Sequence, residues 1–340
     1  MKIYIIITVV LLSCIDLKAQ DIHFSQFDVN VTSLNPAHAG VLQRDFRVAN
    51  NYKNQWGSVG LPYTTFSVAY DMNVLKQRPF KKGLSDIGVG LSFSQDKAGV
   101  SKWTQNQLNL SLSAIQEVGR DTKMSLGLQT SYAQNSVMVD DLSWDNQFVN
   151  NQYSETAPTR ESFANSSKTY IDLSGGVLLE SRITEEQIFT GGIAYFHVNK
   201  PVYTLFSNDK LPSKLVVHAS YETPIGGKLS MRRLVPKFMY VRQGSHNEVL
   251  VGALYRSVMK ESSSHTTYAN ETYIDFGAYY RMNDALIIVA ALDFKNFRFG
   301  VSYDTNVSKF KTATKSRGGF EVSLSYKGFL ADNRTKLKKT

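Results

Sequence analysis

The stretch Asp86-Ile87-Gly88-Val89-Gly90-Leu91-Ser92-Phe93-Ser94 alternates apolar residues with small or polar ones. Successive side chains of a β-strand point to opposite faces of a sheet, so this stretch has one apolar face and one small or polar face. The same alternation recurs at 108–113, 124–129, 297–304 and 320–327. Segments of about ten residues with this period are typical of transmembrane barrel strands, so the sequence predicts an all-β chain.

Candidate strands can be placed along the whole chain. They lie near 43–55, 62–72, 85–95, 103–116, 122–134, 169–179, 187–197, 214–222, 229–241, 247–257, 271–281, 285–293, 296–304 and 319–328. A soluble sandwich also alternates, but apolar positions here often end in aromatic residues, as at 66–70 and 274–280, which suits the girdles of a membrane barrel. The mean hydropathy of -0.23 argues against helical spans and suits a polar lumen. We expect a transmembrane antiparallel β-barrel of about 14 strands over residues 43–330.

The even strand number fixes the expected topology. An even number of strands returns the chain to its starting side, so we expect both termini in the periplasm. The longest connection, about 135–168, then lies outside the cell together with Trp144, and Lys76 to Lys82 forms a basic periplasmic turn. Residues 331–340 form a basic periplasmic tail. No linker or composition shift divides the chain, so one domain is expected after the N-terminal segments.

The first residues have the features of an export signal. An apolar run from Ile3 to Leu12 follows Lys2, and Leu17-Lys18-Ala19 is a small-residue cleavage pattern. We therefore expect residues 1–19 to be a signal peptide that is removed. The alternative is a lipoprotein cleavage box, with Cys14 acylated. Cys14 is the only cysteine of the sequence, so a chain cleaved after Ala19 would carry no disulfide and no thiolate metal site.

Residues 20–42 form a polar, strand-poor segment ahead of the first strand. Two phenylalanines flank Ser25-Gln26, and Asn35-Pro36 followed by small residues indicates a turn. We expect a clasp or plug that folds back against the barrel mouth or lumen, because each apolar side chain left in water forgoes roughly 1.5 to 3 kcal/mol of burial. A merely ordered N-terminal extension is the alternative. The candidate clasp and partner contacts are Phe24, Phe27, Asn35, Pro36, Gly40, Gln55, Trp56 and Trp144.

The charge and the site chemistry favour some functions over others. The formal net charge of +9 falls to +8 without residues 1–19, and no basic run is interleaved with aromatic residues. Anionic lipid or glycan headgroups therefore fit better than nucleic acid, and a solvated basic surface fits as well. His218 is expected on an inner strand face, without a Gly-x-Ser-x-Gly elbow, a metal-ligand histidine pair or a phosphate-binding loop. We expect no enzyme activity, no metal or other cofactor and no small-molecule substrate.

Several glycines lie inside the expected strands instead of in turns. They occur in close pairs at 88 and 90, 175 and 176, and 191 and 192. We expect these glycines to relieve crowding on the inner face or to kink the barrel wall.

Several short motifs also occur in a fixed order along the chain. They are Phe24 to Phe27, Asn35 to Ala37 with Gly40, Tyr52 with Gln55 and Trp56, Tyr170 to Val177 with Asp172 and Gly176, Gly192 through His197 to Pro201, Leu211-Pro212 with His218, Tyr280 to Leu286, Gly300 to Ser308, and Gly319 to Tyr326. In this order they resemble the PorP/SprF family of type IX secretion system outer-membrane proteins, over nearly all of the mature chain.

The resemblance implies a non-enzymatic outer-membrane component of type IX secretion. Such a component supports export or surface retention of proteins with a C-terminal sorting domain and, in some members, gliding motility. Its expected partners are outer-membrane lipid, secretion components and large adhesin-type secreted proteins. A porin or small-solute uptake channel is the alternative, and an outer-membrane lipase or protease that uses His218 is a third hypothesis. Because the tail at 331–340 follows the last strand, assembly would have to recognise Tyr326 or Phe329 internally.

Overall fold

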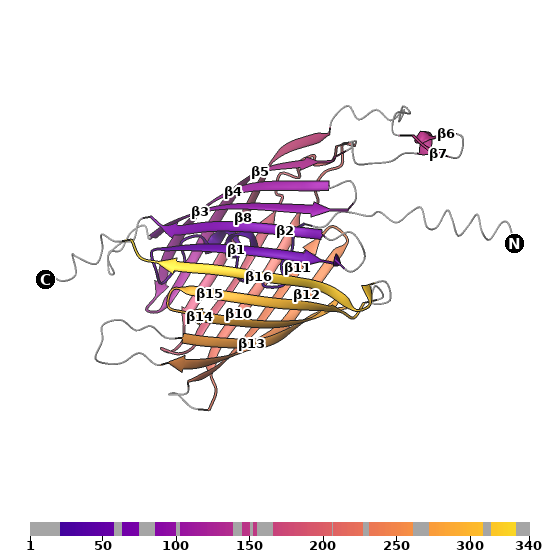
Figure 1. The fold of residues 1–340 in the computed structure, drawn as a ribbon. Coiled ribbons are helices and arrows are strands. Elements are labelled where there is room, and N and C mark those ends of the chain that lie inside the picture. The colour runs from indigo at the N-terminus through magenta and orange to yellow at the C-terminus, as the bar shows by residue number, and fades with distance from the viewer. Residues whose placement is uncertain are drawn as a thin grey trace.

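The computed structural model describes residues 21–57, 63–74, 86–99, 103–138, 145–149, 152–154, 166–205, 207–226, 231–260, 272–308 and 314–330. Most of them belong to one closed antiparallel barrel of 14 strands (Figure 1). The strands are β1 (Phe46–Gln55), β2 (Tyr63–Asn73), β3 (Asp86–Ala98), β4 (Trp103–Gly119), β5 (Thr122–Ser136), β8 (Ser167–Arg182), β9 (Ile188–Phe196), β10 (Lys214–Pro224), β11 (Arg232–Gln243), β12 (His246–Lys260), β13 (Thr272–Arg281), β14 (Ala285–Phe294), β15 (Phe297–Asn306) and β16 (Arg317–Gly328).

The barrel closes because its first and last strands pair. Phe46 lies opposite Gly328 at one end of the β1–β16 seam, and Gln55 lies opposite Gly319 at the other. Closure leaves no open sheet edge, which is the condition for a β-structure to cross lipid. Each expected strand corresponds to one observed strand, so the predicted barrel is confirmed. The sequence did not predict the separate hairpin of β6 (Phe148–Val149) and β7 (Gln152–Tyr153), which lies between β5 and β8.

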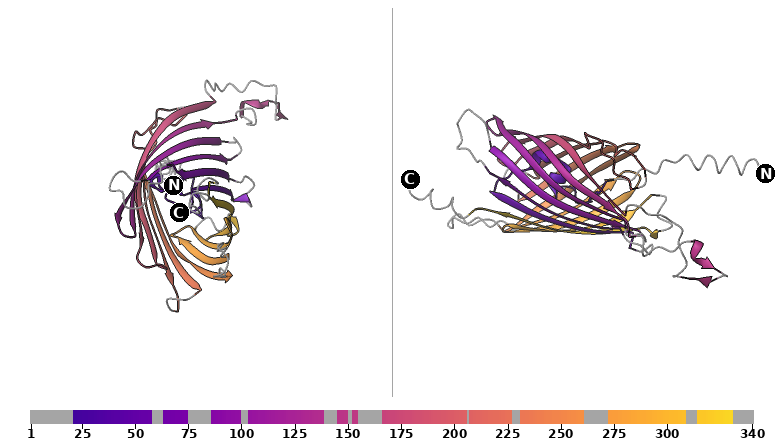
Figure 2. Two further views of the ribbon diagram at one scale, coloured as in Figure 1. Left: turned by 90° about the vertical axis from the view of Figure 1, so that its left-hand side faces the viewer. Right: turned by 90° about the horizontal axis from the view of Figure 1, so that it is seen from above.

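The barrel has two mouths that differ in their connections. We call the end where β1 begins and β16 ends the turn mouth, because it carries the short connections 120–121 and 295–296. We call the opposite end the loop mouth, because it carries the long connections 137–166 and 197–213. Figure 2 shows the barrel end-on in its left panel and from the side in its right panel.

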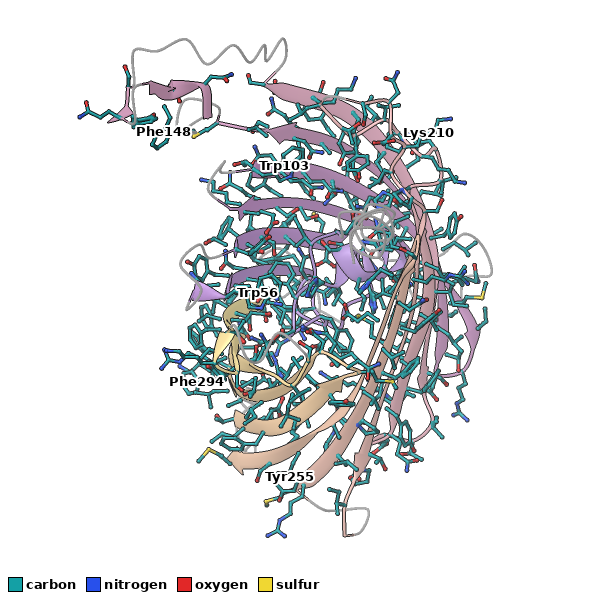
Figure 3. All side chains as sticks on the ribbon, turned by 90° about the vertical axis from the view of Figure 1, so that its right-hand side faces the viewer. Trp56, Trp103, Phe148, Lys210, Tyr255 and Phe294 are labelled. Atoms are coloured by element: carbon teal, nitrogen blue, oxygen red, sulfur yellow. The ribbon has the colours of Figure 1, made fainter. Side chains whose placement is uncertain are left out.

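The outer face carries the apolar members of the alternation. Leu110, Leu126 and Ile288 are exposed on the barrel surface, as lipid-facing positions require. Tyr255 and Phe294 project from the wall in Figure 3 and are also exposed. In the part of the chain that the structure describes, no helix is long and apolar enough to span a membrane.

The inner face has two chemically different sides. The inner face of β2 to β5, which we call the serine wall, carries Ser67, Ser92, Ser111, Ser113 and Ser131, all buried. The inner face of β10 to β14, which we call the apolar wall, carries Val216, Met239, Leu250, Leu254, Tyr279 and Ile287, also buried. The expected polar lumen is therefore right for the serine wall, whereas the apolar wall combines these side chains with buried charges such as Lys237, Asp275 and Arg281. Buried aliphatic side chains need a partner to exclude water, so something must fill the lumen beside them.

Candidate functional site

The lumen is crossed by residues 21–45, which we call the plug segment. At the loop mouth, Asp21 accepts a bond from Lys214 at 2.6 Å. At the turn mouth, Asp45 donates its backbone N–H to the carbonyl of Gly328, just before β1 begins. The plug segment therefore enters at one mouth and leaves at the other. The expectation that both ends of the mature chain lie on one side is wrong, because Asp21 and the end of β16 lie at opposite mouths.

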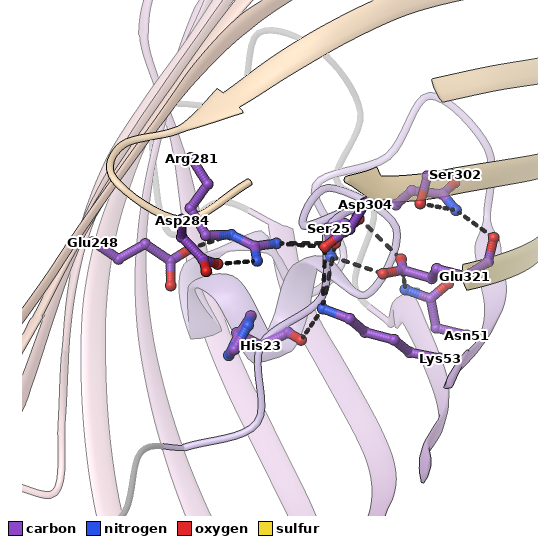
Figure 4. Close-up of polar contacts among 11 residues, drawn as sticks. His23, Ser25, Asn51, Lys53, Glu248, Arg281, Asp284, Ser302, Asp304 and Glu321 are labelled. Atoms are coloured by element: carbon purple, nitrogen blue, oxygen red, sulfur yellow. Dashed lines mark hydrogen bonds and ion pairs between the residues drawn. The ribbon is translucent and has the colours of Figure 1, made fainter. Parts of the chain in front are cut away.

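Ser25 and Gln26 are fixed by a carboxylate of the last strand. Glu321 accepts the backbone N–H of Ser25 at 2.7 Å and that of Gln26 at 3.0 Å. The hydroxyl of Ser25 donates to Asp304 at 2.7 Å and accepts from Arg281 at 3.0 Å (Figure 4). Two backbone N–H groups and one hydroxyl of the plug segment are thus bonded to the wall, and these bonds fix its position.

The charges around Ser25 form a buried ionic cluster drawn from four strands. Its members are Lys53 of β1, Arg281 of β13, Asp304 of β15 and Glu321 of β16 (Figure 4). Arg281 lies 3.1 Å from Asp304, and Lys53 lies 3.8 Å from the same carboxylate. Arg281 also lies 3.6 Å from the buried Glu248 and 2.9 Å from Asp284, so each buried carboxylate has a cation nearby, as buried charges require. Because the strands come from both ends of the chain, the cluster ties the plug segment to the closure of the barrel.

The middle of the plug segment lies against glycines of the wall. An added Cβ at Gly127 would collide with the backbone of Ala37, and one at Gly88 would collide with the carbonyl of Ala39. An added Cβ at Gly176 would collide with the side-chain amide of Asn35. The expectation that inner glycines relieve crowding is confirmed at Gly88 and Gly176, where the group that they accommodate is the plug segment, but not at Gly175, where an added Cβ has room.

Asn35 organises this contact through both ends of its side-chain amide. Its Oδ1 accepts the backbone N–H of Ala37 at 3.0 Å and so caps the short 3-10 helix η1 (Pro36–His38). Its Nδ2 donates to the carbonyl of Val177 at 2.9 Å. The helix α2 (Val31–Leu34) precedes it. Asn35 is fully buried, so its amide fixes both the local turn and the position of the plug segment against β8.

The apolar side chains of the plug segment face the apolar wall. Phe27 and Leu34 belong to one buried cluster with Leu250, Leu254 and their neighbours. The rings of Phe27 and Tyr279 lie 6.2 Å apart between centroids, within the range of favourable aromatic pairs. Phe24 is half-buried and lines a cavity of about 80 Å³ at the loop mouth.

Gly40 ends the plug contact near the turn mouth. Its φ of 68° lies in the left-handed region that favours glycine, and an added Cβ would meet the backbone of Met72 and Gly88. Its N–H donates to Asp71 at 3.0 Å, and Arg47 holds the same carboxylate at 2.8 Å.

His197 forms a latch at the loop mouth. Its two ring nitrogens lie 2.8 Å from Asp21 and 3.0 Å from Asp172. Burial alone would lower the pKa of His197, but the two carboxylates outweigh it and raise the pKa to about 9. Burial would raise the pKa of Asp21, yet Lys214 and His197 hold it well below its usual range. At neutral pH the latch is therefore a charged imidazolium between two carboxylates.

The predicted clasp residues do not form a single site. Phe24, Phe27, Asn35, Pro36 and Gly40 belong to the plug segment, as described above. In contrast, Gln55 and Trp56 lie where β1 ends at the loop mouth, in the wall of the barrel. Trp56 donates its backbone N–H to Gly318 at 2.7 Å, and its ring stands edge-on to Tyr63 at 5.3 Å. This location suits an aromatic girdle.

Several sequence predictions fall outside the described residues. They concern the signal peptide 1–19 with Cys14, the turn from Lys76 to Lys82, Trp144 and the tail 331–340. The buried ionic cluster of Lys53, Arg281, Asp304 and Glu321 was not predicted from the sequence. The sequence does contain an indication of this cluster. Each of the four is an ionisable residue at an inward-facing strand position, where a buried charge needs a partner.

His218 contacts two residues of the plug segment. Its Nε2 lies 3.3 Å from Nδ2 of Asn35, and its ring stacks on His38 at 5.1 Å between centroids. Among the described residues, no group of three or more His, Cys, Asp or Glu side chains could hold a metal ion.

The closed wall, the apolar outer face and the occupied lumen together define a plugged outer-membrane β-barrel protein. The family model of the type IX secretion system membrane protein PorP/SprF matches residues 16–326. The chain belongs to this family, and the resemblance of its ordered motifs is confirmed.

Solved structures show likeness in fold at low sequence identity. The TodX deltaS2S3 mutant monoaromatic hydrocarbon channel has a TM-score of 0.47 and 10% identity, over 90% of this chain and 95% of that one. CdiB from Acinetobacter baumannii has a TM-score of 0.45 and 10% identity, over 84% of this chain. This chain spans 60% of the length of CdiB. A comparison with curated protein sequences gave no match.

Proposed function

We propose that the protein is a non-conducting, non-enzymatic component of type IX secretion in the outer membrane. It supports export or surface retention of partner proteins that carry a C-terminal sorting domain. Family membership supports the link to this secretion system. In the orientation that we propose, the loop mouth faces the cell exterior and the turn mouth faces the periplasm, since outer-membrane barrels keep short turns inside.

The observation that carries the proposal is the plug segment. It is bonded to charged groups at the loop mouth, packed in the middle and held by Asp71 near the turn mouth. A barrel whose lumen is filled in this way has its mouths and outer rim left for contact with partners. Function must then reside in the shape and chemistry of these surfaces.

The alternative of a porin or uptake channel needs an open path through the barrel. The buried ionic cluster and the contacts of the plug segment with wall glycines argue against such a path. The purified barrel in planar bilayers should therefore conduct poorly. Steady open-channel conductance of the wild-type protein would favour the channel instead.

The test in cells compares a deletion strain with strains complemented by the wild type and by Trp56→Ala. We expect quantitative proteomics of the cell surface and medium to lose a small set of sorting-domain proteins on deletion, with general membrane integrity kept. The wild-type gene should restore them, and Trp56→Ala tests whether the rim residue contributes. Unchanged sorting-domain proteins together with a reduced nutrient uptake rate would contradict the secretion proposal.

A further inference from the structure

A recess of about 660 Å³ opens at the turn mouth, between the plug segment and the wall. The plug side contributes apolar residues such as Val29, Val31 and Leu42 and also the polar or charged Asp28, His38, Gln43 and Arg44. The wall side contributes residues of β1, of β8 to β16 and of the turn at 295–296. The recess thus has apolar positions among charged and polar ones, and it is large enough for several side chains of another molecule.

Cationic side chains outnumber anionic ones around this recess. The lining cations are Arg44, Arg47, Arg233, Arg256, Lys295, Arg298 and Lys327, and the lining anions are Asp28, Glu180, Glu222 and Asp293. A recess with low-dielectric walls focuses such an imbalance and attracts groups of opposite charge.

Most of the arginines in the recess are already neutralised. Arg256 and Arg298 both pair with Asp275, at 2.9 and 2.7 Å. Arg233 pairs with Glu222 at 2.8 Å. In the same way, Arg47 pairs with Asp71 at 2.8 Å, and Lys237 behind the lining pairs with Asp28. These pairs fix the wall and leave little charge free for a ligand.

Lys327 differs from these arginines. It lies on the inner face of β16, its side chain is exposed, and it has no ion pair among the described residues. The charges that act on it are mainly cations, Arg47, Arg298 and Arg256, with the carboxylate of Asp293 opposing them. Glu180 of β8 also interacts electrostatically with Lys327, without forming an ion pair with it. Lys327 is therefore a cation that an incoming carboxylate can neutralise.

We propose that this recess binds an acidic peptide segment of a periplasmic partner protein, with Lys327 as the anchoring cation. Apolar plug residues such as Val29, Val31 and Leu42 receive aliphatic side chains of the segment, and Lys327 receives one of its carboxylates. The size of the recess favours a peptide over a lone small anion. The assignment of the partner to the periplasm depends on the orientation proposed above, whereas the binding chemistry does not.

The test uses the purified full-length barrel in nanodiscs and a fluorescent peptide of alternating glutamate and valine. We expect saturable binding that weakens as salt is added. Lys327→Gln should raise the dissociation constant about three- to tenfold, and Lys327→Glu should raise it further. The matched control is Lys210→Glu, which changes an exposed lysine at the loop mouth (Figure 3) and should leave the dissociation constant unchanged.

Three results would overturn the assignment. One is equal binding of the acidic peptide by Lys327→Glu and the wild type, in barrels whose heat-modifiable mobility on gels shows that both are folded. Another is equal binding of a peptide with lysine in place of glutamate. The third is binding of inorganic phosphate to a barrel that does not bind the peptide, which would make the recess a small-anion site. Peptide binding is measured apart from secretion, so failure of the proposed function in cells leaves this result intact.

Discussion

The serine wall meets the plug segment with hydroxyls and glycines, whereas the apolar wall meets it with large aliphatic and aromatic side chains and with a few charges such as Lys237 and Arg281. On the serine wall, Ser113 donates to the carbonyl of Ala39 at 2.6 Å, and Gly127 lets the backbone of Ala37 approach. On the apolar wall, Phe27 packs against Tyr279 in a cluster without directional bonds.

The two walls therefore contribute differently to the position of the plug segment and to the free energy that holds it. A net hydrogen bond contributes about 0.5 to 1.5 kcal/mol but fixes direction and distance. Burial of a large apolar side chain contributes roughly 1.5 to 3 kcal/mol without selecting one geometry. The serine wall and its glycines therefore determine where the plug segment lies, and the apolar wall supplies more of the free energy that keeps it there.

The largest effect is expected from filling the glycine contact. Gly176→Val would place methyl groups where the amide of Asn35 lies, so the plug segment should leave its place. Chymotrypsin should then cleave the folded barrel after Phe24 and Phe27, which are protected in the wild type. Gly175→Val is the matched control, because an added Cβ there meets its nearest atoms at 3.5 Å. Equal protection of both variants would refute the role of the glycines in position.

The next effect concerns the buried ionic cluster between the two walls. Lys53→Met leaves Asp304 and Glu321 with only Arg281 to balance them, and breaking a buried ion set typically costs roughly 3 to 5 kcal/mol. We expect the urea midpoint of the barrel in lipid vesicles to fall accordingly. A midpoint within experimental error of the wild type would show that the cluster is not needed for stability.

A paired truncation compares the two walls directly. Leu250→Ala removes a fully buried side chain of the apolar wall and should lower the free energy of unfolding by about 2 to 5 kcal/mol. Ser111→Ala removes a hydroxyl of the serine wall that donates to Gln129 at 3.3 Å, and should cost about 1 kcal/mol. Equilibrium unfolding in urea measures both. Equal losses would remove the distinction between the walls.

The smallest effect is local and depends on pH. The pKa of His197 is about 9 in the fold, above the value of about 6.5 expected for an unfolded chain. Its contribution to the latch is fully present below about pH 6.5 and is lost as the pH rises through about 9. Cleavage of the first residues of the plug segment by an added protease should therefore rise across this window. His197→Gln should abolish the pH dependence, and an unchanged profile in that variant would contradict the latch.

The sequence predicted the wall of this molecule better than its interior. Alternation at 86–94 and its repeats placed strands along most of the chain, because lipid outside requires an apolar residue at every second position. The plug was expected from Phe24, Phe27 and Asn35-Pro36, but its path through the lumen was not. A two-residue period of hydrophobicity shows that a strand has two different faces, but it does not show what each face contacts.

The apolar wall shows why the lumen was harder to predict. Residues 285–292 are apolar on both faces, so the alternation that marks other strands is absent there. Ile287 and Val289 point inward only because the plug segment and neighbouring side chains exclude water from them. The partners of Glu321 could not be predicted from local sequence either, because its bonds to Ser25 and Gln26 span almost the whole sequence.

That span has a consequence for the order of assembly. The contact between Ser25 and Glu321 links residues 296 positions apart, so it cannot form until the last strand has arrived. Contacts of such sequence separation carry a large loop-closure entropy and form late in folding. The same strand also makes the final seam with β1. Sealing of the wall and capture of the plug segment thus require the same strand, and a chain interrupted before β16 would retain neither.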